Sequence, residues 1–291
     1  MTRLGSRLCA AGFAAVASLP ATGGSVLPGN VVDVRAGEFF FQAPDSIPAG
    51  LTTFRLTQAG MLAERSRAGL SGRALVADRG DNTRGFHMLW VVRLEDGKTI
   101  SDLHRAEQTR APTPWARVIG GPASAIPPRT TNATLDLPPG NYALVCHVGG
   151  AREDRTRSHL LNGKFRALTV VAKDGPAAKA PVPDVTAQIV GDGSIRLSRP
   201  FARGRQVIRV ENATDREYEF KFQRVMPPLT ASAFMAQRES IEPGLVWGGL
   251  SSVPAGGTVT TTMEFEPGEY VVGTWPPIRH RTSVVFIVAP R

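Results

Sequence analysis

The sequence predicts an all-β protein built from two tandem Greek-key β-sandwich domains, each with at most one short helix. Three observations support this fold class. Short alternating runs are rich in Val, Phe, Thr and Tyr, clusters of Gly, Pro and Asn separate them, and both halves of the chain show the same order of segments. Five or six such strands in a unit of roughly 110–140 residues are typical of a β-sandwich.

The first 22 residues are predicted to be a signal peptide. Arg3 and Arg7 precede an apolar run over residues 8–17, which ends in the small residues of a cleavage pattern. The run is too short to cross a bilayer, and no later segment approaches the roughly 20 apolar residues that a spanning helix needs. We therefore expect a periplasmic or secreted protein with no integral membrane segment after signal removal.

Residues 172–184 predict a linker between two folded units. They are rich in Pro, Ala, Gly and charged residues, and they show no apolar period. The mature chain then divides into a first domain over residues 28–171 and a second domain over residues 185–291.

The two domains repeat each other. Three segments of the first copy match segments of the second: the one with Gly50 matches the one with Gly204, and the one with Arg93 matches the one with Arg224. The third match is between residues 139–142 and residues 267–270. The first copy is longer, and its extra residues fall in the basic stretch 61–85, so we expect an inserted loop there.

The pattern of alternation predicts antiparallel strands and gives their ranges. Strands are predicted at residues 31–41, 51–57, 86–94, 130–135, 142–147 and 165–171 of the first copy, and at 206–211, 218–225, 259–265, 269–274 and 283–288 of the second. One short helix is predicted in each copy, at residues 100–108 and 230–238. The runs that begin at Trp247 and Trp275 are predicted to be loops.

The composition narrows the function. The formal net charge is +9, and the chain stays basic without its signal peptide, so an acidic redox or protein partner is expected. Export and the lack of a nucleic-acid motif argue against nucleic acid. We find no nucleophile elbow, Walker loop or paired-histidine zinc helix, and the chain has only five histidines, so we expect no enzymatic activity.

Cys146 is the one cysteine that remains once Cys9 leaves with the signal peptide, which excludes an internal disulfide. A lone thiol in an exported protein is a buried small hydrophobe, an intermolecular bridge or a metal ligand. His159 follows Cys146, and His87 lies on an apolar run before it. Taken singly, His87 fits a core histidine and His159 a solvated one. Together with the thiolate, they are the donor set of a trigonal His2Cys copper site.

With these residues the first copy resembles the cupredoxins, the family of plastocyanin and azurin. Three segments carry the resemblance: Phe86-His87 before a strand, residues 139–142 leading to Cys146, and residues 158–165 before the last strand. In that family they supply the first histidine, the cysteine, and the second histidine with an axial methionine. The resemblance implies an exported bacterial protein with two cupredoxin-like domains, the second degenerate. It further implies one copper ion bound through His87, Cys146 and His159, for electron transfer or copper handling.

The sequence departs from the cupredoxin pattern in several places. The axial methionine position falls on Lys164, whose charge would repel copper unless the side chain turns away. Residues 149–158 lengthen the loop between the ligands. In the second copy, Tyr218 takes the place of His87 and Thr274 that of Cys146, so no metal is expected there. The alternative is a metal-free tandem β-sandwich that acts as a structural or protein-binding module.

Overall fold

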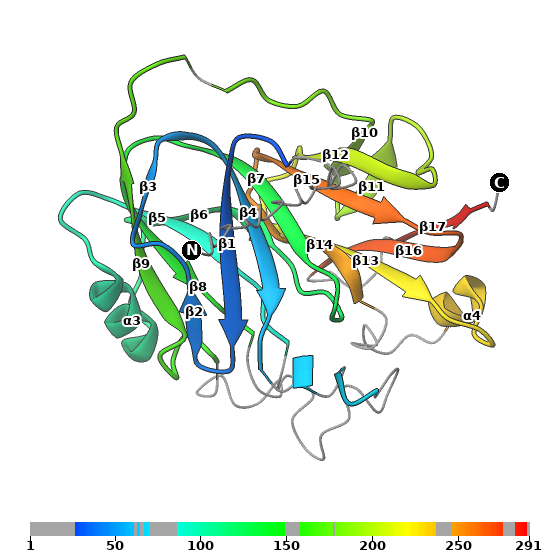
Figure 1. Ribbon diagram of the computed structural model, residues 1–291, viewed down its shortest axis with the longest axis horizontal. Coiled ribbons are helices and arrows are strands. Elements are labelled where there is room, and N and C mark those ends of the chain that lie inside the picture. The colour runs from blue at the N-terminus through cyan, green and yellow to red at the C-terminus, as the bar shows by residue number, and fades with distance from the viewer. Residues whose placement is uncertain are drawn as a thin grey trace, which may run out of the picture.

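The structure is a computed structural model that describes residues 27–60, 63–64, 67–69, 86–148, 158–176, 178–236, 246–275 and 283–289. These residues form a nearly all-β fold of two sheets (Figure 1). The eight-stranded sheet has the order β11 (Ser194–Leu197), β10 (Val185–Val190), β12 (Gly204–Asn212), β15 (Thr258–Phe265), β7 (Thr131–Leu137), β4 (Gly50–Gln58), β1 (Asn30–Gly37) and β2 (Phe40–Gln42).

The nine-stranded sheet has the order β17 (Ser283–Val288), β16 (Gly268–Trp275), β13 (Tyr218–Val225), β14 (Val246–Val253), β6 (Ala116–Pro122), β5 (Trp90–Leu94), β8 (Gly140–Val145), β9 (Phe165–Val171) and β3 (Ser46–Pro48). Helix α3 (Ile100–Thr109) and helix α4 (Ala231–Ala236) lie at opposite ends of the molecule in Figure 1. Both sheets therefore run through both halves of the chain.

The two sheets bury one hydrophobic core, because alternate residues of each strand face inward. On β1, for example, Val32 and Val34 are buried while Val31 and Asp33 are exposed. The largest cluster of buried side chains joins first-copy residues such as Phe54 to second-copy residues such as Phe222. The core is thus continuous between the two copies.

Equivalent strands of the two copies meet at the centre of each sheet. β7 pairs with β15, and β6 pairs with β14, so the order of equivalent strands reads the same outward from the centre in both directions, except that β3 at one edge of the nine-stranded sheet has no counterpart. Each copy also closes the same corner with a tyrosine. The Tyr142 hydroxyl donates to the Pro138 carbonyl at 2.7 Å, and the Tyr270 hydroxyl donates to the Glu266 carbonyl at 2.9 Å.

The two copies meet along the strand pairs β7–β15 and β6–β14, which we call the seam. Buried polar side chains form hydrogen bonds across it. The Asn132 amide donates to the Thr262 carbonyl at 2.7 Å, and the Thr262 N–H donates back to Asn132 Oδ1 at 2.8 Å. The Ser251 hydroxyl donates to the Leu89 carbonyl at 2.6 Å. Because buried polar groups are costly to leave unpaired, these bonds fix how the copies join.

The sequence predicts several elements with correct ends. Strands β9, β13 and β17 have the predicted bounds, and α3 and α4 lie at the two predicted helix positions. Helix α3 begins with a capping box in which Thr99 and Asp102 each accept from the other's backbone N–H.

Other expectations about the strands are wrong. Trp247 and Leu250 lie in β14 and not in a loop, and β6, its partner, was not predicted at all. Glycine pairs interrupt the apolar pattern of both strands, at residues 120–121 and 248–249, which hides them from sequence inspection. The predicted strand 31–41 is two strands separated by a turn, and residues 86–89 precede β5.

The pattern predicted antiparallel strands, but three of the strand pairs in the described residues are parallel. β1 pairs in parallel with β4, β10 with β12, and β3 with β9. A parallel pair cannot be joined by a tight hairpin, and the chain places other strands between these partners. Alternation within a strand gives no information about this choice.

The segments outside the sheets include the predicted linker, the predicted insertion and the predicted signal peptide. β9 ends at Val171 and β10 begins at Val185, and the described residues between them are in no helix or strand. Within the predicted insertion, Ala63, Glu64 and Arg67 are helical, which was not predicted, and most of residues 61–85 lie outside the described part. The predicted signal peptide also lies outside it. Among the described residues, no helix is long and apolar enough to span a bilayer.

We expect the two copies to unfold in one transition, and Phe222→Ala tests this. Phe222 is fully buried, and its ring contacts those of Phe201, Phe220 and Phe265 in the second copy. Truncating it should lower the free energy of unfolding by about 3 kcal/mol, whereas Phe222→Leu should cost about 1 kcal/mol. Urea unfolding, followed by tryptophan fluorescence and circular dichroism, should give one shifted midpoint. Two separate transitions, with the first copy unaffected, would contradict a shared core.

Candidate metal centre

His87 lies just before β5, on a segment that hydrogen bonds hold in place. The Gln58 side-chain amide donates to the His87 carbonyl at 2.8 Å, and the Leu89 N–H donates to the Pro122 carbonyl at 3.1 Å. The imidazole is fully buried, which lowers the pKa of His87 and favours its neutral form. A neutral imidazole can donate a lone pair to a metal.

Cys146 follows β8 directly, and its side chain is fully buried. Burial raises the pKa of the thiol, whereas the positive charge of Lys164 and the N–H groups of Met88 and Val148 act in the opposite direction. These two backbone N–H groups point at the sulfur, so they would stabilise a thiolate once a metal displaces the proton.

His159 lies on a compact turn between Cys146 and β9. The His159 N–H donates to the Val148 carbonyl at 2.8 Å, and the Lys164 N–H donates to the His159 carbonyl at 2.8 Å. His104 of α3 supports the same turn, because its Nε2 lies 3.2 Å from the Leu161 carbonyl. The ring of His159 is buried and not solvated, so the ordinary expectation for a histidine in an arginine-rich loop is wrong here.

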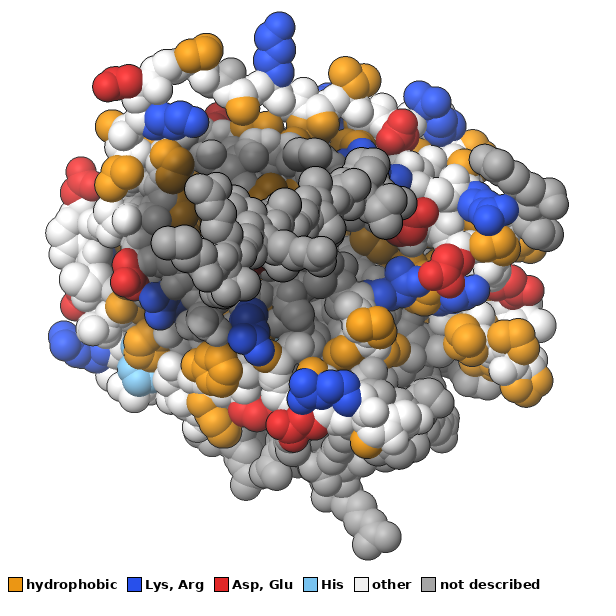
Figure 2. Space-filling model, viewed as in Figure 1, with side chains coloured by type: hydrophobic (Ala, Val, Ile, Leu, Met, Phe, Trp, Pro, Cys, Tyr) orange, Lys and Arg blue, Asp and Glu red, His pale blue; other side chains and the backbone are white. Residues whose placement is uncertain are grey.

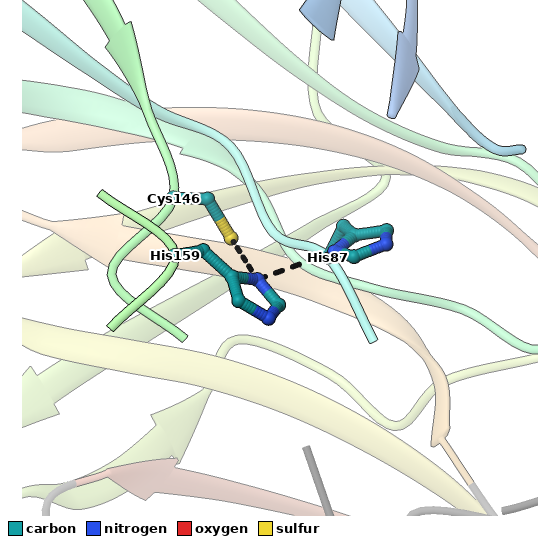
Figure 3. A group of neighbouring side chains, drawn as sticks. All are labelled: His87, Cys146 and His159. Atoms are coloured by element: carbon teal, nitrogen blue, oxygen red, sulfur yellow. Dashed lines mark hydrogen bonds between the residues drawn. The ribbon is translucent and has the colours of Figure 1, made fainter. Parts of the chain in front are cut away.

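The fold brings these three side chains together, although they come from separate segments (Figure 3). His159 Nδ1 lies 3.3 Å from His87 Nδ1 and 3.4 Å from Cys146 Sγ. All three donor atoms lie within 4.8 Å of one another. A trigonal metal site with bonds of about 2.0–2.3 Å separates its donors by about 3.5–3.8 Å, so small adjustments would accommodate an ion. The soft thiolate and two imidazoles fit copper best.

Glu38, which the sequence did not single out, lies beside the cluster. It occupies the turn between β1 and β2, and its Oε2 is 3.5 Å from His87 Nε2. A carboxylate at this nitrogen favours the tautomer whose Nδ1 is free to bind metal. No sequence signal could have identified Glu38, because the contact depends on the turn within the predicted strand 31–41.

Lys164 does not turn away into solvent. Its side chain is fully buried, its Nζ donates to the Gly37 carbonyl, and the same nitrogen lies 5.0 Å from the centre of the Phe41 ring. Burial lowers the pKa of Lys164 to about 8, so the group remains mainly an ammonium at pH 7. Its charge lowers the pKa of both His87 and Cys146, which places it close to the cluster.

The remaining histidines stay apart from this cluster. His147 is exposed and lies edge-on to Trp90, with ring centres 5.3 Å apart. The ring centres of His104 and Phe165 are 4.9 Å apart, and His104 contacts the turn that carries His159 without joining the three donors. His280 lies outside the described residues.

The equivalent place in the second copy is filled by other groups. Tyr218 is fully buried there, and the Thr274 hydroxyl donates to the Gly193 carbonyl at 2.8 Å. A Cβ at Gly193 would lie within 3 Å of both side chains, which shows how closely they pack. Within the described ranges, the second copy shows no group of histidine, cysteine or carboxylate donors of the kind found in the first.

A groove of about 670 Å³ lies elsewhere, along the seam between the copies. Arg55, Arg129 and Arg205 line it, together with Trp247. Arg55 pairs with Asp33, and Arg129 pairs with Glu266 and stacks on the Trp247 ring. Since Arg55 and Arg129 already have carboxylate or aromatic neighbours, we assign no ligand to the groove.

Neither a protein-family model nor a curated protein matches the sequence. Among solved structures, the chain is similar to auracyanin B, with 21% identity over 50% of this chain and 92% of that one and a TM-score of 0.30. It is also similar to a multicopper oxidase, with 13% identity over 91% of this chain and 92% of that one and a TM-score of 0.24. A third similar structure is the copper nitrite reductase of Nitrosomonas europaea, with 12% identity over 90% of this chain and 83% of that one and a TM-score of 0.22. Because these TM-scores are low, the likenesses carry no argument, and the description of a nearly all-β fold of two sheets rests on the strand order given above.

Proposed function

We propose that this protein binds one copper ion through His87, Cys146 and His159 and uses it for electron transfer or copper handling. The observation that carries the proposal is the meeting of one thiol and two imidazoles, all buried, with donor atoms 3.3 and 3.4 Å apart. Three scattered residues of these types rarely converge in a core, where polar groups are costly to bury.

The surrounding residues support this use. Copper would supply a one-electron redox centre. The Met88 and Val148 N–H groups would hold the thiolate, Glu38 would orient His87, and the turn at residues 158–164 would hold His159. Because these groups are fixed by packing and hydrogen bonds, the site would rearrange little when copper is loaded.

Several further expectations belong to this proposal. We propose a periplasmic or secreted location, a division into domains at residues 172–184, Greek-key connections within each domain and no catalytic activity. We also propose a redox or protein partner with an acidic surface. On the face shown in Figure 2, basic and acidic side chains of the described residues are interspersed, so this view favours no single docking patch.

The test is a copper titration of the purified mature protein. We expect one copper per chain after gel filtration, whether copper is added as Cu(I) under argon or as Cu(II). An intense visible band from the thiolate should appear when the bound ion is Cu(II). Copper well below one equivalent for both ions, with no band, would contradict the proposal and favour the metal-free binding module.

A further inference from the structure

The candidate metal centre has one carboxylate and one ammonium beside its three donors. Glu38 lies against His87 Nε2, and Lys164 is hydrogen-bonded to the carbonyl of Gly37, the neighbour of Glu38. Gly37 is the last residue of β1, and Glu38 is the first residue of the turn that leads to β2. The Lys164 side chain is fully buried, and that of Glu38 is 23% exposed. Neither charge is therefore well screened by water.

The charges of these groups distinguish the two oxidation states of copper. The Cys146 thiolate and Glu38 carboxylate are negative, the Lys164 ammonium is positive, and the two imidazoles are neutral. With Cu(I), the whole group of charges is neutral. With Cu(II), it carries one uncompensated positive charge in a mostly buried place, which is costly.

The hydrogen bonding of Lys164 points the same way. Lys164 occupies the position expected for an axial ligand, but its Nζ donates to Gly37 and offers no lone pair to a metal. The donors that remain are one thiolate and two imidazoles. A soft thiolate favours Cu(I), and a site without an axial donor adds nothing that would favour Cu(II).

From these observations we propose that Lys164 makes the centre selective for Cu(I), so that the cuprous ion is the form of copper this protein holds most tightly. The inference rests on the proposed copper binding, and it assigns Lys164 a positioning and electrostatic role and not that of a ligand. It favours a protein that accepts and retains cuprous copper, or an electron carrier of high potential.

The test compares the dissociation constants of Cu(I) and Cu(II), measured by competition with chelators specific for each ion. Lys164→Met removes the charge and restores the side chain of the family pattern, and Lys164→Gln removes the charge but keeps a donor for Gly37. Both variants should reduce the preference for Cu(I) at least tenfold, which equals 59 mV for a one-electron couple. Glu38→Gln should shift the preference the other way. Lys98→Met, which removes a lysine over Trp115, should change nothing.

The outcomes separate this inference from the proposed function. A wild-type protein that binds Cu(II) as tightly as Cu(I), or Lys164 variants with an unchanged preference, would overturn the inference and leave copper binding intact. No binding of either ion at one equivalent would overturn both. Circular dichroism and thermal unfolding of each variant identify one that fails to fold, and the Gln variant covers a folding failure of the Met variant.

Discussion

Replacing Cys146 with serine is expected to abolish copper retention, with the affinity falling on the order of a thousandfold. The thiolate is the soft, charged donor of the set, whereas a serine hydroxyl stays protonated at neutral pH and is a hard oxygen. Two neutral imidazoles would remain, and the positive charge of Lys164 would face the metal without the negative sulfur. The copper content after gel filtration and the visible spectrum measure the change.

The design of this experiment separates loss of the metal from loss of the fold. Serine is close to cysteine in size and can accept the N–H groups of Met88 and Val148, so Cys146→Ser should keep its circular dichroism spectrum. His147→Ala is the matched control, because His147 is adjacent in sequence but exposed. It should retain copper fully. A Cys146→Ser protein that still binds one copper would show that the metal is held elsewhere.

The residue types of the candidate site could be predicted from the sequence because they are chemically distinctive. A cysteine that directly follows a predicted strand, with one histidine before it and one after it in the sequence, has few uses, and the structure brings all three side chains together. The tyrosine of each Pro-Gly-x-Tyr segment also revealed the repeat, since Tyr142 and Tyr270 fix the same corner in both copies. Signals of this kind lie within a few neighbouring residues, so they can be recognised in the sequence without knowledge of tertiary contacts.

The groups around the donors could not be predicted, because their positions depend on pairings between distant segments. Glu38 reaches His87 only because β1 and β2 form a hairpin over the site. Lys164 was expected either to turn away or to weaken binding. The Gly37 carbonyl, 127 residues earlier in the chain, instead gives its ammonium a buried partner. Neither contact leaves a periodic pattern in the sequence.

The close approach of β14 to β13 also depends on a pairing between separate segments, and it carries the second large prediction. Gly249→Ala is expected to lower the free energy of unfolding by about 4–5 kcal/mol. A Cβ at Gly249 would lie 2.1 Å from the Phe220 carbonyl oxygen on the paired strand β13, and the backbone φ is +126°. The neighbour is backbone, so no side-chain rotation can relieve the clash.

Gly204→Ala is the control that separates the clash from backbone strain. Its φ is +92°, and nothing lies within 4 Å of the Cβ it would gain, so only strain of about 1–2 kcal/mol is expected. Urea unfolding of both variants and the wild-type protein gives the difference directly. Equal destabilisation by the two substitutions would mean that the close approach of β13 and β14 is not what requires glycine.

Gly121 is the equivalent of Gly249 in the first copy, and the comparison of the two positions connects the seam to the metal centre. A Cβ at Gly121 would lie 1.8 Å from the Leu89 carbonyl oxygen, which also accepts the Ser251 hydroxyl. Leu89 is two residues from His87, so displacing it must move the first imidazole. Gly121→Ala should therefore lose copper affinity as well as stability, whereas Gly249→Ala, measured below its unfolding midpoint, should retain copper. If both variants retained copper equally, the position of His87 would not depend on the close approach of Gly121 to Leu89.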